Sequence, residues 1–344
     1  MLAELTVPRL CTFDSEDWRI IARFWYPIAL GAEVGVAPHG VTLLDQPLVV
    51  YRGEGSLVVA DDICPHRGVP LSRGRADEAG ISCAYHGFRF GAEGRCVGVP
   101  AHPQAKIPSR LHLRTYPAVE RYGLIWTCLA AVPGEEPAIP PVPHWGEAGY
   151  QLINCPSIDI AAFAGRQVEG FLDVAHFGFV HVGTFGDPNN PVVPDYTPVE
   201  TEDGFEVEYW STVGNYAIGS VDHSEPGFLW LRHFRMHLPF TATLEIHFPD
   251  GGRLVIMNAA SPVSARMTRM FAPICRNFDT DQPEAAVHEF NRIVFEEDRA
   301  IVEVQKPENL PLDPRLEVNV PADRSSIAYR RALRGLGLGT FFTV

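Results

Sequence analysis

The sequence lacks the features of a membrane protein or a nucleic-acid-binding protein. No apolar run in the 344 residues reaches the ~18–20 residues that a membrane-spanning helix needs. The N-terminal stretch has no basic region followed by an apolar one, as an export signal has. Lys and Arg number 28 against 42 Asp and Glu, and the net charge of −14 disfavours phosphate-rich partners. We therefore expect a cytoplasmic protein that binds neither nucleic acid nor membrane.

Cysteine is scarce, and a dinucleotide-binding loop is missing. Seven Cys are too few, and odd in number, for a disulfide framework. The GLGLG stretch near the end neither follows a predicted strand nor opens a predicted helix, so we expect no nicotinamide or flavin bound by such a loop. In a reducing compartment, Cys beside His is better explained by metal or redox chemistry.

The distribution of proline divides the chain. At ~100–200 residues per domain, 344 residues predict two domains. Five prolines stand between Pro133 and Pro143, where we expect an extended linker, because neither a helix nor a central strand tolerates them.

Before the linker, β-rich runs on either side of residues 53–55 predict a hairpin. After it we expect a helix at 166–181, strands at 205–212 and 226–259 with a turn at 250–252, and an amphipathic helix at 283–305.

Two Cys and two His stand in the pattern C-x-H and C-x-x-H. Cys64 pairs with His66, and Cys83 pairs with His86. Zinc ribbons group like ligands, whereas one Cys and one His on each of two loops suits a two-iron cluster, with both thiolates on one iron and both imidazoles on the other. The pattern favours a Rieske-type [2Fe–2S] cluster. A zinc site, or surface His and core Cys placed together by chance, are the alternatives.

A second set of metal-ligating residues lies in EGFLDVAHFGFVH, at 169–181. Asp173 and His176 are three residues apart and share a helical face. His176 and His181 are five apart, about 140° around an ideal helix, so they meet at one metal only if the helix bends or ends between them. Gly178 permits this. Burying these polar groups in an apolar run without a shared partner is costly. We therefore predict a metal site, with satisfied core histidines as the alternative.

The C-terminal helix offers a third ligand. Four apolar residues at helical spacing define its predicted buried stripe: Val287, Phe290, Val294 and Ile301. Asp298 falls in the middle of this stripe, and Glu297, on its flank, is the rival candidate. Two His and one carboxylate with open positions form the facial triad of non-haem Fe(II) oxygen chemistry.

These motifs resemble those of a known family. Over residues 20–334 the chain is similar to the terminal oxygenase components of Rieske non-haem iron oxygenases, in CPHRGVPLSRG, CAYHGFRF, EGFLDVAHFGFVH and VFEEDRAIVE. Within the family, DPNNP and SIAYRR are similar to the subunits of methylxanthine N-demethylases and aromatic O-demethylases.

The resemblance implies an α+β fold in two domains. The first is a Rieske [2Fe–2S] all-β domain at 18–135. The second, at 136–344, is a catalytic domain with a curved antiparallel sheet and helices, of the helix-grip type. We expect residues 1–17 to pack on the catalytic domain.

The resemblance also assigns roles to the candidate residues. The cluster ligands are Cys64, His66, Cys83 and His86. The mononuclear Fe(II) ligands are His176, His181 and Asp298. A homotrimer is implied, in which Asp173 carries electrons between His86 of one subunit and His176 of the next. Position 170 is Gly where the family often has Asn, which removes an amide near the iron.

The function that follows is that of an oxygenase component. The resemblance implies hydroxylation or oxidative demethylation of a small aromatic or heterocyclic substrate with O₂. Electrons come from a separate NAD(P)H-dependent ferredoxin or flavin reductase, in agreement with the missing dinucleotide loop. A cis-dihydroxylating dioxygenase is the alternative within the family. A Rieske electron carrier or a small-molecule-binding protein without turnover is the alternative from another class.

Overall fold

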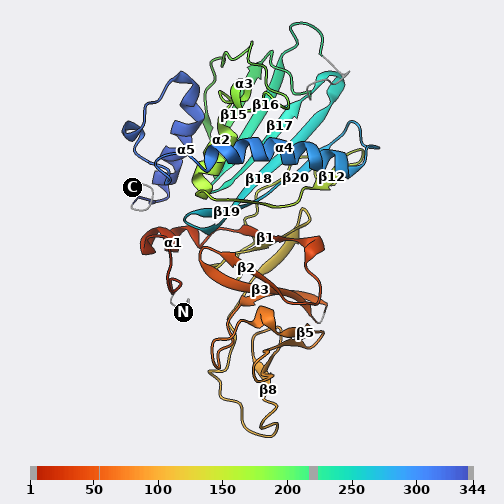
Figure 1. Ribbon diagram of the computed structural model, residues 1–344, viewed down its shortest axis with the longest axis vertical. Helices are drawn as coiled ribbons and strands as arrows, with labels where there is room; N and C mark the ends of the chain where they lie inside the picture. The colour runs from red at the N-terminus through yellow and green to blue at the C-terminus, as the bar shows by residue number, and fades with distance from the viewer. Residues whose placement is uncertain (1–5, 54, 217–223, 340–344) are drawn as a thin grey trace. The chain divides into compact units, whose positions relative to one another are not determined.

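The computed structural model describes residues 6–53, 55–216 and 224–339 (Figure 1). Contacts divide the chain into two compact units, Met1–Ile139 and Pro140–Val344. The division lies inside the proline-rich linker, four residues beyond the predicted end of the first domain at 135. Each unit is described by itself.

Small antiparallel sheets make up the first unit. Among the described residues the strand orders are β1-β11-β10, β2-β3-β4-β9 and β5-β6-β7-β8. The strands are β1 (Tyr26–Leu30), β2 (His39–Leu43), β3 (Gln46–Gly53), β4 (Ser56–Asp61), β5 (Arg75–Asp77), β6 (Gly80–Ser82), β7 (Arg89–Phe90), β8 (Cys96–Gly98), β9 (Thr115–Tyr116), β10 (Ala118–Arg121) and β11 (Leu124–Thr127). Strands β3 and β4 pair as far as Gly53 opposite Ser56, which confirms the predicted hairpin.

The described part of the segment 1–17 packs on this first unit. Thr12 donates its backbone N–H and its hydroxyl to Asp45 Oδ2, at 2.8 and 2.7 Å. Trp18 in helix α1 (Ser15–Ile21) is buried and donates its indole N–H to Leu44 O at 2.8 Å. Within the first unit, the polar groups of the segment find their partners in the turn between β2 and β3. The packing of residues 1–17 on the catalytic domain stays a prediction.

The second unit is built on one antiparallel sheet. Its described strands are β12 (Gln151–Asn154), β13 (Ile158–Ile160), β14 (Val199–Glu200), β15 (Gly204–Ser211), β16 (Trp230–His237), β17 (Thr241–His247), β18 (Arg253–Ser264), β19 (Met267–Phe271) and β20 (Pro273–Arg276). The main order is β12-β20-β18-β17-β16-β15-β14, with β19 bridging β13 and β18. His247 lies opposite Arg253, so the predicted turn at 250–252 joins β17 to β18.

Helices pack against one face of this sheet. They are α2 (Ala164–Leu172), α3 (Phe177–Val180), α4 (Glu284–Val302) and α5 (Arg324–Gly335). Figure 1 shows α4 running across the sheet, and α2 contacts both β17 and β18. In the part of the chain that the structure describes, none of the helices has the length and apolar composition that crossing a membrane takes.

The buried side of α4 agrees with the predicted stripe except at one position. Val287 is buried, and Phe290 and Val294 line the space under the helix. Ile301 is 47% exposed, so its place in the stripe was predicted wrongly. Val302 takes the buried position instead, and adjacent residues project about 100° apart around a helix.

A buried ion cluster ties α2 to α5. Arg330 on α5 donates to both carboxylate oxygens of Glu169 on α2, at 2.6 and 2.9 Å. Arg166 donates to Glu169 Oε2 at 3.2 Å and to Glu317 Oε1 at 2.7 Å. Glu317 also accepts from Arg330, which completes a set of two cations and two anions. Because each buried charge has opposite charges as neighbours, the set avoids the penalty of an isolated buried ion.

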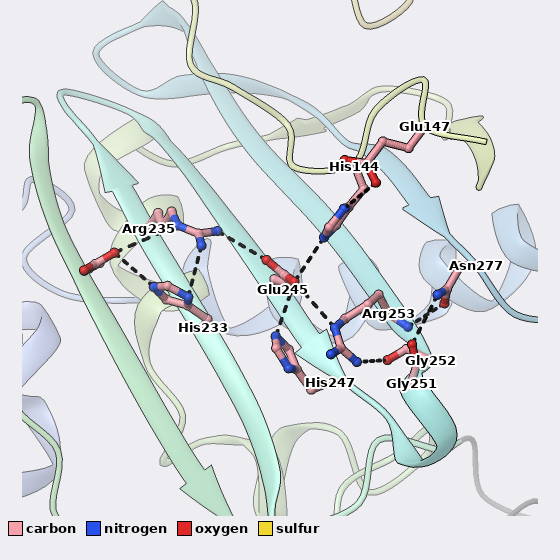
Figure 2. A network of polar contacts seen from close by, with 11 residues as sticks. His144, Glu147, His233, Arg235, Glu245, His247, Gly251, Gly252, Arg253 and Asn277 are labelled. Carbon is pink, nitrogen blue, oxygen red and sulfur yellow. Dashed lines mark hydrogen bonds and ion pairs between the residues drawn. The ribbon is translucent and has the colours of Figure 1, made fainter. Parts of the chain in front are cut away.

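The sheet face away from the helices carries a charged cluster (Figure 2). Residues alternate between the faces of a strand, so Glu245 and His247 lie opposite Leu244 and Ile246. The outer-face cluster consists of His144, Glu206, His233, Arg235, Glu245, His247 and Arg253. Glu245 is its centre, because four of the others lie within 4 Å of its carboxylate: His144, Arg235, His247 and Arg253.

Candidate metal centres and the cavity beside one of them

The Cys-His pairs lie on two loops of the first unit with the same backbone turn. Cys64 follows β4, and Cys83 lies between β6 and β7. In each loop the Cys carbonyl accepts from a glycine four residues later, at 2.9 Å from Gly68 and 3.0 Å from Gly87. Both glycines have positive φ, of 75° and 69°, which side chains rarely allow. Each Cys N–H also donates to the carbonyl five residues later. The sequence thus builds two matching turns.

The side chains of these loops gather at one place. The His66 and His86 rings have centroids 4.9 Å apart, and both Cys side chains are buried. Burial raises the pKa of the Cys64 thiol, and the nearby thiol of Cys83 raises it further. Two thiols inside and two imidazoles toward the surface are the donor set that a Rieske-type cluster needs, since thiolates and imidazoles bind different irons.

The helix predicted over 166–181 is interrupted, and this brings His176 and His181 together. Helix α2 ends at Leu172, and the single turn α3 runs from Phe177 to Val180. His176 precedes α3 and His181 follows it, and their Nε2 atoms are 3.1 Å apart. The prediction placed the bend at Gly178, whereas Gly178 lies within α3. The helix instead ends at Leu172, because the next residue, Asp173, has an extended backbone with φ −79° and ψ 132°.

Asp298 on α4 joins the two histidines. Its Oδ1 lies 3.4 Å from His176 Nε2 and 3.1 Å from His181 Nε2. One possible ligand atom from each of the three residues lies within 4.8 Å of those of the other two. The rival Glu297 points elsewhere, because its Oε2 contacts His181 Nδ1 at 2.8 Å. Asp298 therefore faces the two Nε2 atoms, and Glu297 supports one ring from behind.

Each histidine has a carboxylate behind it. Asp173 Oδ2 lies 3.3 Å from His176 Nδ1, and its Oδ1 accepts the Ala175 N–H at 2.8 Å. Glu297 accepts from Thr184 Oγ1 at 2.9 Å as well as facing His181. A carboxylate at Nδ1 favours the tautomer that keeps Nε2 available to a metal.

Electrostatics reflect how closely these groups are packed. Burial lowers the pKa of His176, but hydrogen bonds and charge from Asp173 and Asp298 outweigh it and raise the pKa to about 9. Burial raises the pKa of Asp298, yet the contacts with His176 and His181 bring it below its usual value. Without a cation, a proton balances this acidic site. Two imidazole nitrogens and one carboxylate oxygen are also a donor set that fits Fe(II) and leaves positions open.

A cavity of about 560 Å³ opens beside the two histidines and Asp298. Its walls come from α2, the α3 region, the inner faces of β17 and β18, and α4. Most of the wall is apolar, with aromatic side chains at Phe171, Phe177, Phe185, Tyr216, Phe248, Phe278, Phe290 and Phe295. A cavity of this size accommodates a small organic molecule beside the metal position.

Of two glycines near the site, the one singled out from the sequence does not line the cavity, and the other makes a close backbone contact. Gly170 is not among the residues that line the cavity, and a Cβ built there meets only Val302 Cγ2, at 3.5 Å. Gly186 was missed, although a Cβ there would lie 2.1 Å from Phe177 O. Its N–H donates to His181 O at 2.7 Å, which closes the turn that follows His181. A lone loop glycine gives no sequence signal of such a contact.

Comparison with known proteins identifies the family. The model of the Rieske [2Fe–2S] domain matches residues 24–117, and that of the vanillate O-demethylase oxygenase C-terminal domain matches residues 160–338. The methylxanthine N1-demethylase NdmA of Pseudomonas putida is 31% identical over 94% of this chain and 91% of its own. The chain belongs to the Rieske oxygenases. A vanillate O-demethylase oxygenase subunit of a Pseudomonas species is 26% identical over 86% of this chain and 95% of its own.

A solved structure of a relative has the same fold. The structure of NdmA of Pseudomonas putida CBB5 with caffeine superposes with a TM-score of 0.80 and 29% identity, over 93% of this chain and 92% of that one. The Rieske oxygenase described here is therefore an oxidoreductase that incorporates oxygen from O₂, with a Rieske cluster and a mononuclear iron. Its partners are a small-molecule substrate and a reductase or ferredoxin.

Proposed function

We propose that His176, His181 and Asp298 hold the mononuclear iron of this Rieske oxygenase. The supporting observation is that one donor atom from each lies within 4.8 Å of the others at the wall of the large cavity. We propose equally that Cys64, His66, Cys83 and His86 hold the [2Fe–2S] cluster. The matching turns of the two loops and the edge-on contact of the His66 and His86 rings support this assignment.

The reaction is oxidative removal of a methyl group from, or hydroxylation of, an aromatic or heterocyclic small molecule. The relatives named for N- and O-demethylation support this choice. Bound iron supplies the activation of O₂ with electrons from the cluster. For a methyl group, one oxygen atom enters a C–H bond and the other leaves as water, at the cost of two electrons and two protons. The carbinol then releases formaldehyde and leaves N–H or O–H on the ring.

The residues around the site position the reactants. Asp173 and Glu297 hold protons at the Nδ1 atoms, so that both Nε2 lone pairs face Asp298 and the cavity. The aromatic walls exclude water and hold a flat ring beside the metal position. Excluding water matters because the delivered electrons are then used to oxidise the substrate. They are not lost in reduced oxygen species that leave the site.

We also propose the homotrimer, with Asp173 as the bridge between the two metal centres of neighbouring subunits. The side chain of Asp173 is 31% exposed, and His86 is exposed at the tip of its loop. Both groups are thus accessible to another subunit, and Asp173 already contacts the His176 ring. A cytoplasmic location stays a prediction, in keeping with seven free cysteines.

The test is turnover of the iron-loaded protein with a surrogate reductase. A panel of N-methyl, O-methyl and unmethylated rings is supplied with O₂, and formaldehyde and hydroxylated products are measured. Formaldehyde in proportion to consumed substrate supports demethylation, whereas a cis-diol without formaldehyde assigns ring dihydroxylation instead. His176→Ala is expected to keep the cluster spectrum and lose all product. Product formation by that variant contradicts the ligand assignment.

Asp173→Asn tests the bridge. The amide keeps the shape of the side chain but loses the charge that holds the His176 proton. The variant is expected to retain three irons per chain and to fall at least about a hundredfold in the rate of substrate oxidation. Rapid reduction of its cluster by the reductase, with slow product formation, locates the loss between the two centres. An unchanged rate contradicts the bridge.

A further inference from the structure

Two buried amide oxygens in the cavity wall have no hydrogen-bond partner. They are Gln167 Oε1 and Asn258 Oδ1. Gln167 is 4% exposed and Asn258 is 2% exposed. Among the described residues, these are the cavity-lining side chains with such an atom. A buried acceptor without a donor is rare in folded proteins, because it loses its water without a replacement.

The local structure places both residues in the cavity wall. Gln167 stands four residues before Phe171 on α2, so both lie on the cavity side of the helix. Its amide nitrogen donates to Met270 Sδ at 3.2 Å, which leaves the oxygen free. Asn258 follows Leu254 and Ile256 at alternate positions of β18, and all three line the cavity.

Two other amides of the wall have a hydrogen-bond partner for one of their polar atoms. Asn215 Oδ1 accepts from Arg232 at 3.3 Å, and Asn291 Nδ2 donates to Val287 O at 2.9 Å. Among the described lining residues, Gln167 Oε1 and Asn258 Oδ1 are the side-chain oxygens that are buried without a partner.

The one Lys or Arg side chain among the described lining residues is Arg276. It donates to Gln151 Oε1 at 3.0 Å and to the Asp279 carbonyl at 2.8 Å. Asp279 and Asp281 also balance its charge. The wall thus offers no uncompensated cation for an anionic substrate, while it offers two acceptors for a donor.

We propose that Gln167 and Asn258 select the substrate by accepting hydrogen bonds from its ring edge. The substrate class is an uncharged aromatic or heteroaromatic ring that carries an N–H or O–H donor, as well as the group to be oxidised. This inference rests on the proposed function and adds the recognition element to it. It makes both amides specificity-determining residues, with no part in the chemistry at the iron.

Matched ligand pairs test the inference without turnover. Dissociation constants are measured by calorimetry on the iron-loaded protein without O₂. Theophylline keeps a ring N–H that caffeine lacks, and vanillin keeps a phenol O–H that veratraldehyde lacks. The wild type is expected to bind the donor-bearing member of at least one pair about tenfold more tightly, and which pair does so distinguishes N–H from O–H as the source. Vanillate, as an anion, is expected to bind more weakly than vanillin.

Variants assign the preference to the two amides. Gln167→Met and Asn258→Leu remove one acceptor each at similar volume, and each is expected to reduce the preference to about twofold or less. Asn154→Leu is the control, because Asn154 Oδ1 is also buried without a partner but does not line the cavity. This variant is expected to keep the wild-type ratio.

The outcomes separate this inference from the proposed function. Equal binding within both pairs, or binding of neither, by the wild type overturns the inference even where a variant does not fold. A ratio that survives in both amide variants overturns it as well. Turnover of methylated rings with no such preference leaves the oxygenase function standing alone. A clear preference without any turnover contradicts the oxygenase function and upholds the recognition site.

Discussion

The two faces of the catalytic sheet carry polar groups in opposite ways. On the outer face, Glu245 is surrounded by imidazole and guanidinium groups, and burial of its carboxylate is offset by those partners. On the inner face, Gln167 of α2 and Asn258 of β18 line an apolar cavity, and the amide oxygen of each is buried without a hydrogen-bond partner. Polar groups that satisfy one another stabilise a fold, whereas polar groups left without partners indicate a ligand.

The pKa shifts support the reading of the outer face as a structural network. Burial raises the pKa of Glu245, but the hydrogen bond from His144 and the charges of His247 and His144 outweigh it and lower the pKa. Burial lowers the pKa of His144, but Glu147 and Glu245 outweigh it and raise the pKa. Both shifts favour the charged forms of the pair, as expected where opposite charges face each other.

The largest difference between the faces is expected when one histidine is removed from each. His181→Ala removes a ligand from the cavity side, and iron content is expected to fall from three to two per chain with loss of turnover beyond a thousandfold. His247→Ala on the outer face is the matched control and is expected to retain three irons and its turnover. Iron analysis and product formation measure both. Three irons in the His181 variant, with normal turnover, contradict the division of roles.

The next effect concerns stability. Glu245→Gln removes the charge at the centre of the outer-face cluster and leaves its cations facing a neutral amide. The free energy of unfolding is expected to fall by about 2 kcal/mol, a loss of about 4–8 °C in melting temperature, with turnover per folded enzyme unchanged. Glu296→Gln is the control, since its ion pair with Arg299 is exposed and worth at most about 0.5 kcal/mol. Equal losses in both variants contradict a special role for Glu245.

A smaller effect is expected in the pH dependence of the same cluster. Because the pKa of His144 is raised in the fold, its stabilising contribution is fully present below its unfolded pKa near 6.5 and is lost as the pH rises through the folded value. His144→Gln should therefore lower the melting temperature more at pH 5.5 than at pH 8.5. In the Glu245→Gln background this difference should shrink without vanishing, because Glu147 still raises the pKa of His144. A penalty that grows with pH contradicts the assignment.

The smallest effect belongs to the cavity face without ligand. Asn258→Leu replaces an unpartnered buried oxygen by an apolar group of similar size. We expect the free energy of unfolding of the ligand-free protein to stay the same or rise by about 0.5 kcal/mol. A melting curve recorded beside that of Glu245→Gln measures the contrast directly. A loss near 2 kcal/mol would mean that the amide has a structural partner.

The residues proposed to bind the metals could be named from the sequence because their chemistry is local. Cys64 and His66, or Cys83 and His86, stand within a few positions on short loops, and so do His176 and His181. Asp298 could be named because a carboxylate on an apolar helical stripe is conspicuous. The proline-rich linker and the hairpins were predictable for the same reason, since turn residues act over a few positions.

What could not be predicted depends on packing between distant segments. Helix α2 ends at Leu172 and does not continue to a bend at Gly178. This end depends on how α2 and α3 pack against the sheet and α4. The contact of Glu297 with His181 depends on which way α4 faces, and the two residues are 116 positions apart in sequence. The bare oxygens of Gln167 and Asn258 can be recognised only once all their possible partners are placed.

The ion cluster that joins α2 to α5 has a consequence for how this enzyme diverges. Arg166 and Glu169 hold α2 to Arg330 and Glu317 on the side away from the cavity. These ion pairs hold the helix by contacts that do not involve residues 167 and 171. Substitutions at positions 167 and 171 can therefore change the cavity wall, and with it the substrate, while the buried ion pairs still anchor α2 to α5.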